Sequence, residues 1–164
     1  ADRLVVDALL HDDLSVVSSL GFRLGKQAII ASLPMSIGTD GLELYNYRTK
    51  SKSHISEALT NVIEQGLISE ILLTDWKNEG YPVSFDKTLV ELFPFQKIPL
   101  ITFGGISNAK QMKTLFARSN IAAVAVGNFL NYREHSIKEF KDTMASATLR
   151  SPSYATENSL QADV

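Results

Sequence analysis

The fold of this chain is decided by the stretch Pro99-Leu-Ile-Thr-Phe-Gly-Gly-Ile-Ser-Asn108. Its apolar residues form a run short enough for a buried strand, and Ser107 and Asn108 are candidate caps of a following helix. The two glycines, Gly104 and Gly105, let backbone N–H groups approach a ligand, and a helix N-terminus attracts negative charge. The stretch therefore indicates either a phosphate-binding turn or a tight structural turn that needs glycine.

The composition excludes several classes of function. The chain has 164 residues, of which 45% are hydrophobic and 21% charged, as in one ordinary soluble domain or a large part of one. A net charge of −2 argues against general binding to nucleic acid or to anionic membranes. The absence of cysteine excludes disulfides, thiolate metal sites and a cysteine nucleophile.

The sequence supports expectations on the location of the protein and on both ends of the chain. No apolar run approaches the ~20 residues of a membrane span and no signal peptide is recognisable, so we expect a cytoplasmic protein. The chain begins with Ala1 directly before a strand-like run, which predicts that an N-terminal part is missing. We expect one folded domain over residues 1–150 and a polar, disordered tail over 151–164.

A strand, a loop and a helix recur five times along the chain. The expected strands cover residues 3–10, 27–33, 68–74, 100–103 and 122–127. Buried strands that alternate with amphipathic helices predict a parallel sheet, either doubly wound or a (β/α)8 barrel, with functional residues after the strand ends. We expect Pro34 to close the second strand and Asp40-Gly41 to turn an antiparallel hairpin, and a helix to begin at Ser53.

Three stretches together resemble the cyclase subunit of imidazole glycerol phosphate synthase. They are Glu70-Ile-Leu-Leu-Thr74 with Glu79-Gly80, Pro99 to Gly105, and Ala122 to Phe129. The resemblance runs from residue 1 to about 147. It implies a (β/α)8 TIM barrel of which this chain holds only the five C-terminal units, strands four to eight. It also implies two phosphate sites at the carboxyl ends of the strands.

The resemblance implies that one phosphate site is built from Glu79, Gly80, Gly104, Gly105, Gly127 and Asn128. Late loops of such barrels often hold phosphate, which supports this prediction. This chain has Glu79-Gly80 where the family has Asp-Gly, and Asn128 where the family has a small hydroxyl residue. Asparagine can still donate to phosphate, whereas a glutamate side chain would repel it.

The other end of the implied active site departs further from the family. Asp7-Ala8 stands where the family has Asn-Thr, so a carboxylate replaces phosphate donors. Pro34 stands where the family has the catalytic Asp, and proline has no proton to transfer. The remaining candidate catalytic residues are Asp7 and Asp75, although a Thr74-Asp75 pair at a strand end is also a frequent structural cap.

The resemblance places an ammonia gate and a partner interface at the amino ends of the strands. Asp2, Arg3, Gln27 and Glu70 fall on these positions, where the family's glutamine amidotransferase (glutaminase) subunit docks. The alternative for Arg3 and Glu70 is an ordinary salt bridge at the floor of the barrel.

Other polar and aromatic residues give weaker signals. The three histidines are scattered, so we expect neither a metal site nor a cofactor. His11 is expected to be a solvent-facing loop residue. Trp76 and Tyr81 would either stack on a ligand or pack their own loop.

The resemblance implies an ammonia-dependent lyase or cyclase that acts on a phosphorylated or sugar-derived small molecule. The lost acid favours a paralogue that supplies ammonia for acetamidino modification of surface sugars. The first alternative is the true cyclase of histidine biosynthesis, an amino-acid biosynthesis enzyme that forms imidazole glycerol phosphate. The second alternative is a non-catalytic docking scaffold.

Overall fold

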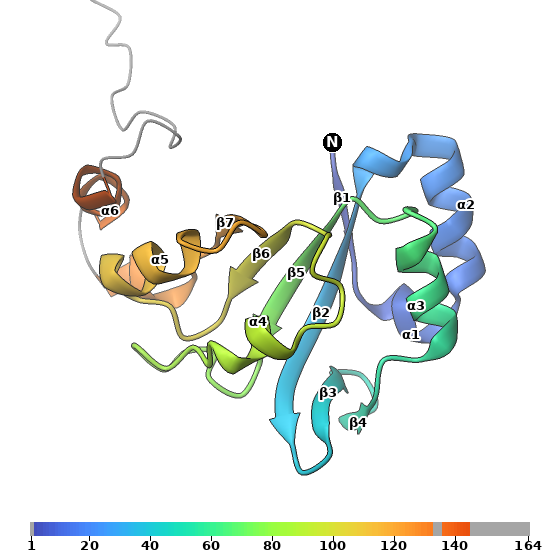
Figure 1. Cartoon of the computed structure of the whole chain (residues 1–164), viewed down its shortest axis with the longest axis horizontal. Helices are drawn as coiled ribbons and strands as arrows, with labels where there is room; N and C mark the ends of the chain where they lie inside the picture. Colours follow the sequence, from blue (N-terminus) through green and yellow to red (C-terminus); the bar gives the residue numbers. More distant parts are fainter. Residues whose placement is uncertain (1, 133–135, 145–164) are drawn as a thin grey trace, which may run out of the picture.

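The computed structural model describes residues 2–132 and 136–144. The predicted tail over 151–164 and the predicted domain end at 150 lie outside the described residues. Figure 1 shows the sheet with its helices packed beside it. In the described part of the chain, no helix combines the length and the apolar character that a membrane span requires.

Five parallel strands follow one another in the sheet in the order of the sequence. They are β1 (Leu4–Val6), β2 (Ile29–Gly38), β5 (Glu70–Asp75), β6 (Leu100–Phe103) and β7 (Ile121–Val124). Each pairs in parallel with the next, without the reversal of strand order that defines a doubly wound sheet. The chain is therefore part of a (β/α)8 barrel, as the sequence predicts.

The helices alternate with these strands along the chain, and the last helix follows β7. They are α1 (Ala8–Asp12), α2 (Leu14–Leu24), α3 (Glu57–Glu64), α4 (Thr88–Leu92), α5 (Ala109–Phe116) and α6 (Ser136–Met144), with 3₁₀ turns at Lys26–Ala28 and Asn128–Tyr132. Figure 1 shows α2 and α3 beside one another next to β1 and β2. The cap of α2 is Asp13, whose carboxylate accepts the Ser15 N–H at 2.9 Å.

A hairpin extends the second parallel strand. Its strands are β3 (Gly41–Asn46) and β4 (Ser51–Ser53), which confirms the antiparallel excursion. Because Gly38 pairs with Gly41, the two turn residues are Thr39 and Asp40 rather than the predicted Asp40 and Gly41. The prediction that Pro34 closes its strand is wrong. The pairing with β1 ends at Ala31 and that with β3 begins at Met35. Proline fits in this gap because no strand on that side needs the N–H it lacks.

Two further predicted boundaries are wrong. The first strand ends at Val6 rather than at residue 10, because residues 8–12 turn into α1. A short apolar run does not by itself distinguish a strand from a buried helical turn. The helix expected from Ser53 begins at Glu57, because residues 51–53 pair with β3 and Ser56 is the cap that accepts the Leu59 N–H at 3.2 Å.

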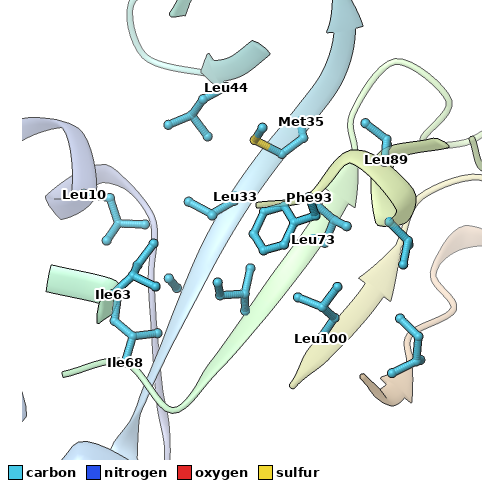
Figure 2. Packing of buried hydrophobic residues seen from close by; sticks show 14 of the residues in the cluster. Leu10, Leu33, Met35, Leu44, Ile63, Ile68, Leu73, Leu89, Phe93 and Leu100 are labelled. Atoms are coloured by element: carbon cyan, nitrogen blue, oxygen red, sulfur yellow. The ribbon is translucent and has the colours of Figure 1, made fainter. Parts of the chain in front are cut away.

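The hydrophobic core lies between the helices and one face of the sheet. Figure 2 shows its side chains in one cluster, among them Leu33, Leu73 and Leu100 from three neighbouring strands. Side chains alternate along a strand, so their sequence neighbours lie on the opposite, inner face of the barrel. Ser32 pairs with Leu72 and Pro34 with Thr74 on that inner face.

Replacing a core leucine should cost far more stability than replacing an exposed one. Leu73 is 0% exposed and Leu92 is 52% exposed. We expect Leu73→Ala to lower the free energy of unfolding by about 2–5 kcal/mol through lost burial and a residual cavity, and Leu92→Ala by less than about 0.5 kcal/mol. Denaturant unfolding of the full-length protein measures both, and equal losses would contradict this packing.

Candidate functional site

A pocket of about 620 Å³ lies at the carboxyl ends of β5, β6 and β7. Three loops form it, one after each strand. Its lining residues are Glu79, Gly80, Tyr81, Pro82, Phe103, Gly104, Gly105, Ile106, Ser107, Ala125, Gly127, Asn128 and Phe129. The structure thus brings all the residues predicted for the phosphate site around one pocket.

The two central glycines are required by backbone packing. Gly104 has a φ of +96° and Gly105 a φ of +71°, which side-chain-bearing residues rarely adopt. A Cβ on Gly104 would lie 2.5 Å from the carbonyl oxygen of Asp75. A Cβ on Gly105 would lie 2.7 Å from the backbone nitrogen of Phe85. The turn therefore needs glycine for structural reasons, and this requirement is compatible with ligand binding.

The pocket offers backbone donors instead of cationic side chains. Within the described residues, the N–H groups of Ile106, Gly127 and Asn128 donate to no protein acceptor. The described residues that line the pocket include neither lysine nor arginine. An anion in this pocket would therefore be held by peptide dipoles, as in other glycine-rich turns.

A carboxylate and a phenol meet at the rim of the pocket. The Tyr47 hydroxyl donates to Oε2 of Glu79 at 3.5 Å, which gives this carboxylate a donor from the hairpin. Burial raises the pKa of Tyr47 to about 12, and the negative charges of Glu79 and Asp7 add to the effect. The Tyr47 phenol thus stays protonated at neutral pH beside the Glu79 carboxylate.

The two candidate acids occupy different environments. Asp75 is 2% exposed, and its carboxylate accepts the Asn78 side-chain amide at 2.8 Å and the Asp86 N–H at 2.8 Å. This arrangement supports the structural-cap alternative for Asp75. Asp7 is half-buried at the end of β1, and its carboxylate accepts one long hydrogen bond of 3.4 Å from the Ser32 hydroxyl. Asp7 is therefore the more accessible candidate for proton transfer.

The four predicted gate residues lie at the opposite, amino ends of the strands. Arg3, before β1, forms an ion pair with Glu70, the first residue of β5. The pair spans β2, because Ile30 lies in register with both Val5 and Glu70. Asp2 is exposed before β1, and Gln27 is exposed before β2. The ion pair predicted as the alternative is present, while the gate stays a prediction.

Two predictions on single side chains have clear outcomes. His11 is not a solvent-facing loop residue, because it lies in α1 and its Nε2 is buried without a described partner. Trp76 packs its own loop against the hairpin, with its ring stacked on Tyr45 at a centroid distance of 3.9 Å. Tyr81 is 67% exposed and lines the pocket. The described residues include no group of three or more acidic or histidine side chains placed to hold a metal.

Two residues of the site escape prediction from sequence. Ile106 contributes a backbone N–H, and its apolar side chain gives no sign of this. Tyr47 reaches Glu79 because the hairpin folds back, and the alternation of apolar and polar residues over 42–47 indicates a strand but not this contact.

Comparison with known proteins gives one family. Residues 1–136 match the family described as Histidine biosynthesis protein. The imidazole glycerol phosphate synthase subunit HisF of Bacillus velezensis is 29% identical over 151 residues, which are 88% of this chain and 59% of that protein. HisF of Bacillus subtilis is 28% identical over 148 residues, 86% of this chain and 58% of that protein. HisF of Chloroherpeton thalassium is 24% identical over 144 residues, 86% of this chain and 57% of that protein. The chain thus spans less than two thirds of these curated relatives.

A methyl group on Gly105 should disturb the turn more than one on Gly80. Both residues have positive φ, but a Cβ on Gly80 meets nothing within 4 Å. We expect backbone strain of about 1–3 kcal/mol in both alanine variants and an additional loss of stability only in Gly105→Ala. Denaturant unfolding tests this, and similar losses in the two variants would argue against the close contact with Phe85.

The raised pKa of Tyr47 predicts a loss of stability at high pH. An unfolded tyrosine ionises near pH ~10 and Tyr47 in the fold at about 12, so its stabilising contribution is complete below pH ~10 and is lost as pH rises toward about 12. We expect Tyr47→Phe to flatten the pH dependence of unfolding in this interval. Tyr81→Phe, which removes an exposed phenol, is the control, and an unchanged pH dependence in Tyr47→Phe would contradict the prediction.

Proposed function

We propose that this chain, which belongs to the histidine biosynthesis protein family, acts within a cyclase-subunit-like (β/α)8 barrel that receives ammonia from a glutamine amidotransferase partner. In this proposal ammonia enters at the strand ends that carry Arg3 and Glu70. It is used at the opposite ends, beside the pocket of Gly104 and Gly105. The names of the HisF relatives and the resemblance of the strand ends support the type of reaction, an ammonia-dependent lyase or cyclase.

The observation that carries the choice of substrate is Pro34. Its neighbours Leu33 and Met35 are buried in the core, so residue 34 lies on the inner face of the sheet, in register with Thr74. The family resemblance implies an acid at this inner position. Proline removes the proton donor that ring closure would use, which supports a paralogue that delivers ammonia for acetamidino modification of surface sugars.

The end of β1 supports the same choice. The carboxylate of Asp7 accepts a hydrogen bond from the hydroxyl of Ser32 in β2. A carboxylate therefore stands where the resemblance implies the second phosphate site. A carboxylate repels phosphate, and Ala8 offers no hydroxyl donor. Of the two implied phosphate sites, the pocket around Gly104 and Gly105 is then the one suited to an anion. This favours a phosphorylated or sugar-derived substrate with a single anionic group at that pocket.

Two other functions stay open within the family. The true cyclase that forms imidazole glycerol phosphate is favoured by the names of the relatives, and Asp7 would then have to supply the acid. A non-catalytic docking scaffold is compatible with the ion pair of Arg3 and Glu70 at the strand ends of the proposed partner interface.

Complementation distinguishes these functions. A positioned acid contributes roughly 10²–10⁴-fold to a rate, so the full-length protein should fail to support growth of a bacterium that lacks its own histidine-pathway cyclase. The same protein should still bind a glutaminase subunit in a pull-down. Robust growth with the unmodified protein would overturn the paralogue proposal and favour the true cyclase.

Substitutions at residue 34 provide the matched control. Pro34→Asp restores a carboxylate at the inner position, and Pro34→Asn makes the same change of shape without the acid. We expect neither to rescue growth, because Asp7 and Ala8 still disturb the second phosphate site. Rescue by Pro34→Asp alone would show that the missing acid is the only barrier to cyclase activity.

A further inference from the structure

The side chain of Gln111 holds the glycine turn from behind. Gln111 is the third residue of α5 and is half-buried. Its Oε1 accepts the N–H of Ser107 at 3.0 Å, and its Nε2 donates to the carbonyl oxygen of Gly105 at 3.1 Å. Its own N–H donates to the side chain of the cap residue Asn108 at 2.9 Å. Both ends of one amide are thus bonded to the turn.

This arrangement differs from an ordinary helix cap. In a capping box the third helical side chain bonds the N–H of the cap residue itself. Here the amide reaches one residue further back, to Ser107, and also takes the Gly105 carbonyl. The side chain therefore fixes the conformation of the turn between β6 and α5, in addition to the start of the helix.

Fixing the Gly105 carbonyl also directs the next N–H group. The Gly105 oxygen accepts from Ser84 N–H at 2.9 Å, from Phe85 N–H at 3.3 Å and from Gln111. A trans peptide points its carbonyl and its N–H in opposite directions, and the described residues contain no cis peptide. The N–H of Ile106 therefore points away from these three donors. Ile106 lines the pocket, and within the described chain its N–H has no protein acceptor.

Ser107 links the same clamp to the opposite wall of the pocket. Its hydroxyl accepts the N–H of Val83 at 3.0 Å. Val83 has a φ of +55°, which is uncommon for a β-branched residue and must be held by its surroundings. Pro82, its neighbour in the chain, lines the pocket. Because Gln111 fixes Ser107, it acts on both walls without being one of the residues that line the pocket.

We propose that Gln111 is a positioning residue of the anion pocket: it aims the Ile106 N–H at a bound phosphate group and holds the wall around Val83 in place. The inference rests on the proposed function, in which this pocket takes the phosphate of the substrate. In this inference an uncharged side chain outside the pocket preorganises a backbone donor for the phosphate group.

The first test compares two glutamine-to-alanine variants of the full-length protein. Gln96 also clamps backbone carbonyls, those of Phe93 and Val90, at a distance from the pocket. We expect Gln111→Ala to weaken the binding of inorganic phosphate about tenfold, a change of about 1.4 kcal/mol. Gln96→Ala should leave phosphate affinity unchanged. Calorimetric titration measures both affinities.

The second test uses Gln111→Glu and a pH series. An ionised glutamate cannot donate to the Gly105 carbonyl, whereas a protonated one can accept from Ser107 and donate to Gly105 as glutamine does. We expect the ratio of the variant's Kd to that of the unmodified protein to fall toward one as pH drops through the ordinary glutamate pKa of about 4.3. Inorganic sulfate is the probe because its charge is constant over this interval, and circular dichroism confirms the fold at each pH.

The outcomes separate this inference from the function on which it rests. Phosphate affinity that survives Gln111→Ala, or weakening equal to that in Gln96→Ala, would overturn the role of Gln111 alone. If Gln111→Ala does not fold, the pH series decides, and a ratio that does not fall at low pH overturns the role. An unmodified protein that binds no phosphate would overturn the proposed pocket and this inference together.

Discussion

The pocket depends on one backbone carbonyl, that of Gly105. Its oxygen accepts from Ser84 and Phe85 in the loop after β5 and from Gln111 in α5. The loop after β5, the glycine turn and the start of α5 thus meet at one atom, and the first two of these segments line the pocket. A buried carbonyl without donors is costly, so the orientation of this carbonyl depends on where the loop after β5 and α5 lie. The shape of the pocket is in this sense a consequence of satisfying one acceptor.

The buried carboxylate of Asp75 joins this pocket to the core. Asp75 is the last residue of β5, and its carboxylate accepts hydrogen bonds from Asn78 and Asp86 in the loop that also carries the Gly105 donors. Its own carbonyl leaves no room for a Cβ on Gly104. The glycines are therefore dictated by the path of the loop as much as by any ligand. Packing and anion binding here use the same backbone, so they are not competing explanations of the sequence.

The accuracy of prediction from the sequence follows the strength of local signals. The strand at Leu100 and its glycine turn are found because Pro99 and Gly104 bound a short apolar run. Residues 8–12 are missed because their leucines fit a strand and a helical turn equally well. The strand end predicted at Pro34 is wrong because a proline is tolerated inside β2 where neither β1 nor β3 pairs with it. Only the tertiary register determines where those two strands pair. The clamp by Gln111 is likewise invisible, since it departs from the usual capping pattern by one residue.

Between the amino and carboxyl ends of the strands, most of the side chains on the inner face of the barrel are uncharged. At the amino ends the charges of Arg3 and Glu70 are paired with each other. Val5 and Ile30 lie in register with Glu70, and Ser32 and Leu72 occupy the next positions on the inner face. Ionised groups are costly to desolvate in such a lining, whereas a small neutral molecule is not. In the next layer Pro34 adds no charge, and Asp7 is the titratable group at the end of β1. A lining of this kind is compatible with the proposal that a small neutral molecule such as ammonia passes from one end of the barrel to the other.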